Sequence, residues 1–88
     1  MPKKLVQNTD PKNQFRRAIG ERLKAAREGQ KKEIREVARG CNMKVKALER
    51  IEAGQSNFRM LTIDRLCHYY GISRVGIMQA AARDSYRG

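Results

Sequence analysis

Cationic side chains at helical spacing stand out in the middle of the chain. Lys46 and Arg50 are four residues apart, so a helix that contains both carries them on one face. Lys44 lies two residues before Lys46, and Val45 and Glu49 share the outward side. Ammonium and guanidinium groups carry hydrogen-bond donors and no acceptor, and they bind phosphate and other oxygen acceptors. This face is therefore suited to binding a polyanion.

The residues that would support catalysis or a cofactor do not form a comparable set. The sequence has no pairing of a nucleophile with a base, no pair of carboxylates with suitable neighbours and no phosphate-binding glycine loop, so we do not expect an enzyme. Cys41, Cys67 and His68 are too few for a four-ligand zinc site. Both cysteines fall at apolar-periodic positions, and we interpret them as core thiols in a reducing compartment. We expect no cofactor, no metal and no small-molecule substrate.

The overall composition also favours a polyanionic partner. The 88 residues include 20 Lys and Arg against 9 Asp and Glu, which gives a formal net charge of +11. This balance makes nucleic acid the first candidate, although membranes and acidic proteins attract basic chains too. No stretch has the roughly 20 apolar residues of a membrane span, and the N-terminus MPKKLVQNTDPKNQ lacks the apolar run of a signal peptide. We expect one small cytoplasmic domain without a membrane partner.

We expect the cationic face to lie on a helix, because apolar residues recur at helical spacing from Phe15 onward. The sequence predicts a flexible basic arm over residues 1–13, a folded domain over 14–83 and a polar tail over 84–88. The apolar residues of the five predicted helices are Phe15, Ala18, Ile19, Leu23 and Ala26, then Ile34, Val37, Ala38 and Cys41, then Ala47, Leu48 and Ile51, then Met60, Ile63, Leu66, Cys67 and Tyr70, then Val75, Ile77, Met78, Ala81 and Ala82. The predicted fold class is all-α.

Residues typical of helix ends separate these five sets of apolar residues, each of which forms an apolar stripe along its helix. Gly29, Gly54 and Gly71 stand where the first, third and fourth helices would end. Asn42 tolerates the left-handed backbone of a sharp turn between the second and third helices. Ser73 is a candidate N-cap for the last helix. The second and third helices are thus short and joined by a tight turn, which is the arrangement of a helix-turn-helix.

The pattern resembles the phage repressor and Cro-type (Xre-like) helix-turn-helix family from Ile19 to about Met78. The residues that carry the resemblance are Val37-Ala38, Cys41-Asn42-Met43, Leu48, Arg50-Ile51-Glu52-Ala53-Gly54, Ser56-Asn57 and Tyr70-Gly71-Ile72-Ser73. The resemblance implies a five-helix lambda-repressor-like DNA-binding domain. Residues 33–41 would form the positioning helix, and residues 44–53 the recognition helix that enters the major groove of double-stranded DNA.

The resemblance also implies a set of contacts with DNA. The base contacts of the family fall on Lys44, Val45, Lys46 and Arg50. Phosphate contacts fall on Gln55, Asn57 and Arg59, and Lys31, Lys32 and Arg35 would add charge near the positioning helix. In such a set, lysine and arginine donate to the guanine O6 and N7 acceptors, and valine contacts a thymine methyl.

Some residues depart from the family pattern. They are Ile34 in place of a phosphate-binding Gln, Asn42 in place of the turn Gly, Lys44 in place of a Ser or Thr cap, and Glu49 in place of a small residue. A carboxylate at Glu49 either pairs with Lys46 or Arg50, which we favour, or accepts from cytosine N4. Glu52 would oppose DNA through its charge, so we expect it to hold the recognition helix in place.

The expected function is transcriptional regulation, most simply as a dimeric repressor that reads a two-fold operator. Phe58, Leu61 and Tyr69 form a candidate dimer surface outside the predicted core, and the last helix with Ile77 offers a second, unless it merely caps the core. One alternative is a protein-interaction module, such as the antitoxin of a toxin–antitoxin pair, with a protein partner. Another is an architectural protein that binds DNA without sequence preference.

Overall fold

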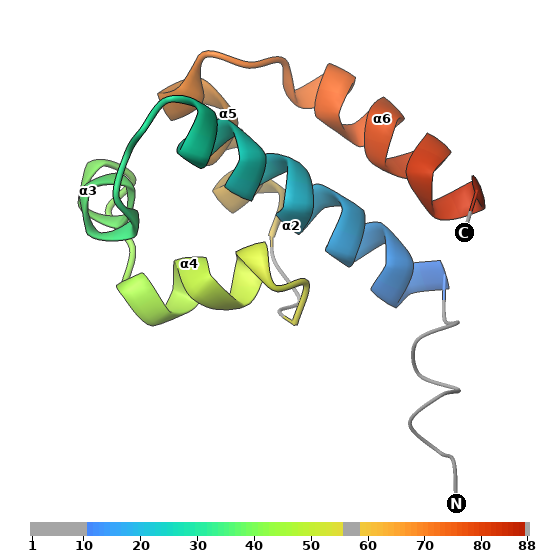
Figure 1. Cartoon of the computed structure of the whole chain (residues 1–88), viewed down its shortest axis with the longest axis horizontal. Helices are drawn as coiled ribbons and strands as arrows, with labels where there is room; N and C mark the ends of the chain where they lie inside the picture. The colour runs from blue at the N-terminus through green and yellow to red at the C-terminus, as the bar shows by residue number, and fades with distance from the viewer. Residues whose placement is uncertain (1–10, 56–58, 88) are drawn as a thin grey trace, which may run out of the picture.

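The computed structural model describes residues 11–55 and 59–87, and within these ranges the protein consists of five α-helices with no strand. The helices are α2 (Pro11–Gly29), α3 (Ile34–Gly40), α4 (Val45–Glu52), α5 (Met60–Tyr70) and α6 (Arg74–Arg87). In Figure 1, α4 and α6 lie on opposite sides of the long helix α2, and α3 is seen end-on beside the start of α4. The predicted all-α, five-helix fold is confirmed.

The predicted arm ends earlier than the sequence suggested. Helix α2 begins at Pro11, so residues 11–13 are helical and do not belong to an arm. A proline suits the first helical position, because its ring fixes φ near the helical value and the N–H at that position has no intrahelical acceptor. Residues 1–10 of the predicted arm lie outside the described residues.

The predicted polar tail is also wrong over residues 84–87, because α6 continues to Arg87. An ion pair between Asp84 and Arg22, with 2.8 Å between Oδ2 and Nη2, links this end of α6 to α2. The hydroxyl of Ser85 donates to the Ala81 carbonyl oxygen at 3.1 Å. Polar composition alone did not reveal these contacts, since their partners lie on another helix or one turn back.

One hydrophobic core joins the five helices. Its largest fully buried side chains all come from the predicted apolar stripes, and they are Ile19, Leu23, Val37, Leu48, Ile63, Leu66 and Cys67. Met60 and Val75 were predicted on the same stripes but are 50% and 57% exposed. Both lie in the first turn of their helix, where the chain enters from a loop at the rim of the core. Helix α6 instead buries Ile77 and Ala81.

Left-handed backbone conformations occur where the sequence predicts turns. Asn42 has φ +56°, and the next N–H, that of Met43, donates to the Ala38 carbonyl oxygen at 2.9 Å. Gly71 ends α5 with φ +74°. Lys31, in the loop after α2, also has φ +56°, which its residue type did not signal. The Asn42 turn closes α3 onto α4 and so sets the angle between the two helices.

The first turn of α6 is capped by Ser73, as predicted. The Ser73 Oγ accepts a hydrogen bond from the N–H of Gly76 at 3.0 Å, a group that has no acceptor inside the helix. We expect Ser73→Ala to lower the free energy of unfolding by about 1 kcal/mol, measured by urea denaturation. Ser73→Asp keeps an acceptor and should retain most of this stability. Equal losses in both variants would contradict a capping role.

Candidate nucleic-acid interface

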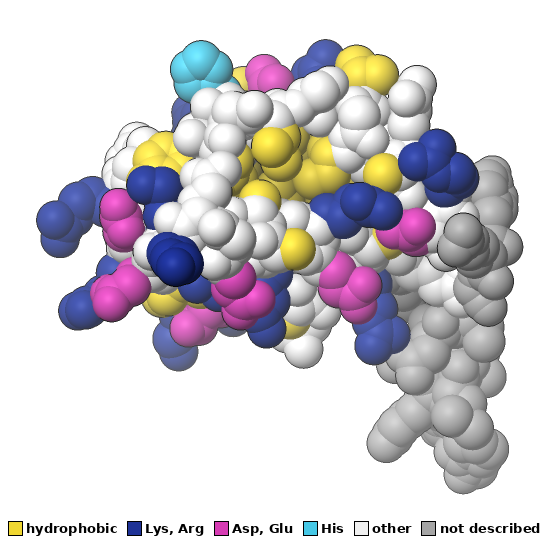
Figure 2. All heavy atoms as spheres, turned by 45° about the horizontal axis from the view of Figure 1, so that its top comes forward, with side chains coloured by type: hydrophobic (Ala, Val, Ile, Leu, Met, Phe, Trp, Pro, Cys, Tyr) yellow, Lys and Arg dark blue, Asp and Glu magenta, His cyan; other side chains and the backbone are white. Residues whose placement is uncertain are grey.

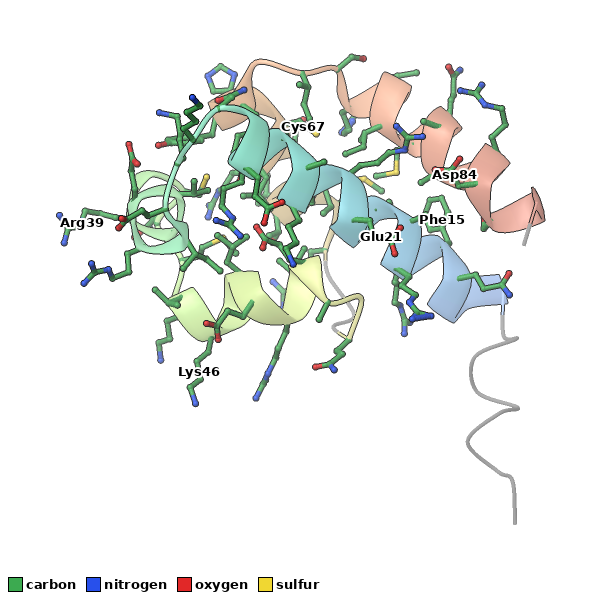
Figure 3. The ribbon with its side chains drawn as sticks, in the orientation of Figure 1. Phe15, Glu21, Arg39, Lys46, Cys67 and Asp84 are labelled. Carbon is green, nitrogen blue, oxygen red and sulfur yellow. The ribbon has the colours of Figure 1, made fainter. Side chains whose placement is uncertain are left out.

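Helices α3 and α4 form a helix-turn-helix with one inward and one outward side. The predicted ranges 33–41 and 44–53 agree with these two helices when the cap residues are counted. Glu33 and Cys41 cap α3, and Lys44 and Ala53 cap α4. The inward side of α4 buries Leu48, Ile51 and Glu52, while Lys46, Glu49 and Arg50 are exposed. In Figure 3 the labelled Lys46 side chain points away from α2 and the rest of the domain. The outward side of α4 is therefore free to meet a partner.

Helix α4 is held against α2 by an ion pair that is almost fully buried. Arg27 Nε donates to Glu52 Oε2 at 2.8 Å, and Arg27 Nη2 donates to Glu52 Oε1 at 3.1 Å. The two side chains are 14% and 6% exposed. The hydrogen bond to Glu52 raises the pKa of Arg27 above its ordinary value, against the effect of burial. The structural role expected for Glu52 is confirmed.

The backbones of α2 and α4 also touch directly at Gly20. A Cβ at this position would lie 2.7 Å from the carbonyl oxygen of Glu52 and nearer still to that of Ile51. Because no side chain separates the helices here, the end of α4 is fixed by main-chain contact. The orientation of the outward side therefore depends on α2.

The four predicted base contacts do not have the same surroundings. Lys46 and Arg50 are exposed on α4, and Lys44 is exposed at its cap position. Val45 is partly buried against the core, which leaves only part of its side chain for a partner. Within the described residues, Lys44, Lys46 and Arg50 make no ion pair within 4 Å. No carboxylate of the described residues neutralises their positive charge within this distance.

The favoured interpretation of Glu49 is not supported. Its carboxylate is exposed and forms no ion pair with Lys46 or Arg50 in the ranges that the structure describes. Lysine and arginine can extend away from a neighbour at one helical turn when water solvates both charges, since such exposed pairs gain little energy. Glu49 therefore adds one unpaired negative charge to the cationic side of α4.

Several of the predicted phosphate contacts already have acidic neighbours. The Lys32 ammonium lies 3.5 Å from a Glu36 carboxylate oxygen, and Arg35 Nη2 lies 3.7 Å from Glu33 Oε1. Lys31 is exposed in the left-handed turn after α2 and is free of such a pair among the described residues. Gln55 and Arg59 are exposed on the two sides of residues 56–58, and Asn57 lies outside the described residues.

Two exposed arginines near this interface were missed by the sequence analysis. Arg39 lies in the last turn of α3, and in Figure 3 its side chain projects away from the domain. Arg17 packs its backbone against Gly54, directly after α4. The spacing of four residues between Arg35 and Arg39 could have revealed the first, because it places both on one side of α3. The position of Arg17 depends on tertiary packing, so no local pattern indicated it.

The candidate dimer surface is only partly exposed. Leu61 is 61% exposed, as expected. Ile77 is 6% exposed and belongs to the core, so its inclusion in a surface was wrong, because α6 turns this side toward α2. Tyr69 is partly buried, with its ring against Gly40 and 5.6 Å from the Lys32 ammonium. Phe58 lies outside the described residues.

The hydrophobic surface lies on another side of the molecule. Figure 2 shows hydrophobic side chains gathered in a hollow with charged side chains around its margins. A hollow between α2 and α6 is lined mostly by small or apolar residues, which are Ala25, Ala26, Ile72, Gly76, Ile77 and Ala80, together with Arg22 and Ser73. The cationic side of α4 and this hollow are therefore separate surfaces.

The cysteines occupy the core as predicted. Cys41 and Cys67 are buried and unpaired, and burial raises the pKa of both thiols. Burial likewise raises the pKa of Tyr70, whose hydroxyl has no hydrogen-bond partner. No group of three or more His, Cys, Asp and Glu side chains in the described ranges is placed to hold a metal ion. None of the described helices is long and apolar enough to cross a membrane.

Comparisons with known proteins agree with this geometry. The helix-turn-helix domain family matches residues 18–77, which is more than half of the chain. No curated protein matches by sequence. Among solved structures, the clp gene regulator ClgR from Corynebacterium glutamicum is similar, with a TM-score of 0.76 and 23% sequence identity over 83% of this chain and 78% of that chain. At this level of identity, the likeness concerns the fold.

Proposed function

Because the chain belongs to the helix-turn-helix domain family, we propose that it is a regulator of transcription that binds double-stranded DNA in a sequence-specific manner. The observation that carries the proposal is the outward side of α4, where Lys46 and Arg50 are exposed and make no ion pair among the described residues. A buried inner side and a donor-rich outer side are what a helix needs to lie in the major groove. We propose that the protein is not an enzyme.

The proposed contacts fall into two groups. Lys44, Val45, Lys46 and Arg50 face the bases, with Lys46 and Arg50 as the principal donors to guanine O6 and N7. Lys31, Lys32, Arg35, Gln55, Asn57 and Arg59 face the phosphates. Phosphate contacts supply affinity and position the protein, and base contacts supply discrimination. The net charge of +11 supports the affinity, and it also predicts strong dependence on salt.

We further propose that the protein acts in the cytoplasm as a homodimeric repressor. One recognition helix reads only a few base pairs, and a two-fold dimer doubles the length of the site. The exposed Leu61, on α5, supports a candidate contact between the copies. Occupation of a promoter by such a dimer blocks access of the polymerase without a further domain. The name of ClgR as a gene regulator is in line with regulation as the class of function.

The proposal is tested by selecting DNA from a random duplex pool and measuring the affinity for the enriched site. In the variant Lys46→Ala/Arg50→Ala, discrimination between the enriched and a scrambled site should fall by about 1–3 kcal/mol per residue. This corresponds to roughly 5- to 150-fold for each residue. Weak, salt-dependent binding to both sites should remain, because the phosphate contacts are intact.

The control is Arg74→Ala/Arg83→Ala, which removes the same charge from α6, across α2 from α4 in Figure 1, and among the described residues breaks only the long, exposed pair of Arg74 with Asp64 at 3.9 Å. This control should bind more weakly at low salt and discriminate as well as wild type. An enriched palindrome would support the dimer. Failure to enrich any sequence would contradict the proposal, with salt-dependent binding then favouring an architectural protein and no binding favouring the protein-interaction module.

A further inference from the structure

The turn between α3 and α4 carries a second cationic feature. A hollow of about 370 Å³ is lined by Ala38, Arg39, Asn42, Met43 and Lys44. Arg39, in the last turn of α3, and Lys44, at the N-cap of α4, are both among the lining residues, so two cationic residues on either side of the turn border one hollow. The lining contains no Asp or Glu among the described residues.

The charges at this hollow differ from those at the start of α3. Lys32 and Arg35 lie within 4 Å of the carboxylates of Glu36 and Glu33. Arg39 and Lys44 are exposed and form no ion pair in the part of the chain that the structure describes. A phosphate that met both side chains would place its negative charge beside two positive charges, which is favourable. The hollow is thus better suited to an oxyanion than the start of α3, where the cations already have acidic neighbours.

The geometry points to a clamp in which Arg39 and Lys44 bind one backbone phosphate of the DNA beside the half-site. The inference rests on the proposed function and deepens it. It adds Arg39 to the interface and moves Lys44 from the base contacts to the phosphate contacts. Lys44 precedes α4 at its cap, with extended backbone at φ −81° and ψ 149°, so it stands at the edge of the helix that enters the groove.

Asn42 is a third polar residue that lines the hollow. Its φ of +56° closes the turn, and Asn42 is exposed and lines the same hollow as Arg39 and Lys44. An amide NH2 is a neutral donor to a phosphate oxygen, whereas a glycine at this turn would supply none. The replacement of the family's turn glycine by Asn42 therefore adds a donor among the residues that line the hollow.

The test measures binding to the enriched site and to a scrambled site over a range of salt concentrations. Arg39→Gln and Lys44→Gln should each weaken binding to both sites alike, and should each reduce the slope of log K against log salt by about 0.9. Arg83→Gln, on α6, is the control for loss of one exposed charge and should change the slope less. A slope for Arg39→Gln equal to that of the control would overturn the clamp.

Two further results separate the clamp from its rivals. If Lys44→Gln weakens binding to the enriched site only, Lys44 reads a base and the clamp is wrong. Replacement of single phosphates by uncharged methylphosphonates should identify one linkage whose loss weakens wild type but not Arg39→Gln. The clamp is overturned if every linkage affects wild type and Arg39→Gln alike. Inhibition of DNA binding by inorganic phosphate at constant ionic strength would then show that the hollow binds a free anion. A wild-type protein that binds no DNA contradicts the proposed function itself.

Discussion

Replacing Glu52 by alanine should lower the free energy of unfolding by about 3–5 kcal/mol, an effect as large as that of truncating a buried leucine. The change leaves the Arg27 guanidinium almost buried without its partner, and an uncompensated charge in such a place is costly. A domain of this size has a total stability of about 5–15 kcal/mol at most, so much of the variant should be unfolded at moderate temperature. Urea denaturation followed by circular dichroism measures the loss.

Two controls separate the buried pair from charge loss in general. Asp84→Asn breaks the pair with Arg22, whose side chains are 43% and 41% exposed, and it should cost less than about 1 kcal/mol. Arg27→Met combined with Glu52→Met removes both charges and should recover most of the stability lost in Glu52→Ala. If Glu52→Ala is no more harmful than Asp84→Asn, the pair does not hold α4 to α2.

Gly20→Ala is expected to destabilise the domain by about 1–3 kcal/mol or more, although alanine is the better helix former. The added methyl group would meet the carbonyl oxygens of Ile51 and Glu52, which belong to the backbone and cannot rotate away. The helices must move apart, and this movement also strains the pair between Arg27 and Glu52. Affinity for the enriched DNA site should fall as well, because the orientation of α4 changes.

Gly29→Ala is the matched control for this exchange. Gly29 is the last residue of α2, and an added Cβ there has no neighbour within 4 Å among the described atoms. Its effect on stability should be neutral or favourable, by up to about 1 kcal/mol through helix propensity. Should Gly20→Ala prove as stable as Gly29→Ala, the close contact of α2 with α4 is not a constraint on the fold. The two variants also separate helix propensity from packing.

The features predicted correctly from the sequence depend on neighbouring residues. Asn42 and Gly71 mark left-handed turns because few residue types adopt that conformation at low cost. Ser73 marks the start of α6 because its hydroxyl can bond an N–H three residues later. The ranges 33–41 and 44–53, which the resemblance implied, match α3 and α4 together with their cap residues. Apolar spacing then identified the fully buried side chains.

The features that were missed depend on residues far apart in the chain. The pairing of Arg27 with Glu52 links α2 to α4, and nothing near either residue indicates the other as its partner. The need for Gly20 arises from the carbonyl groups of another helix. Met60 and Val75 fit an apolar stripe, but the stripe does not tell where the core stops. Helical spacing placed Lys46 and Arg50 on the outward side, and the resemblance assigned them to the bases, yet neither indicated Arg39.

The residues of α4 divide into two sets with separate tasks. Leu48, Ile51 and Glu52 are buried and are bound to the rest of the domain, whereas Lys46, Glu49 and Arg50 touch little of it. Exchanges in the outward set should therefore change stability by no more than about 0.5 kcal/mol, as is usual for surface sites. During evolution such a helix can acquire a new target by drift of a few exposed residues, while selection for folding acts on the inner set alone.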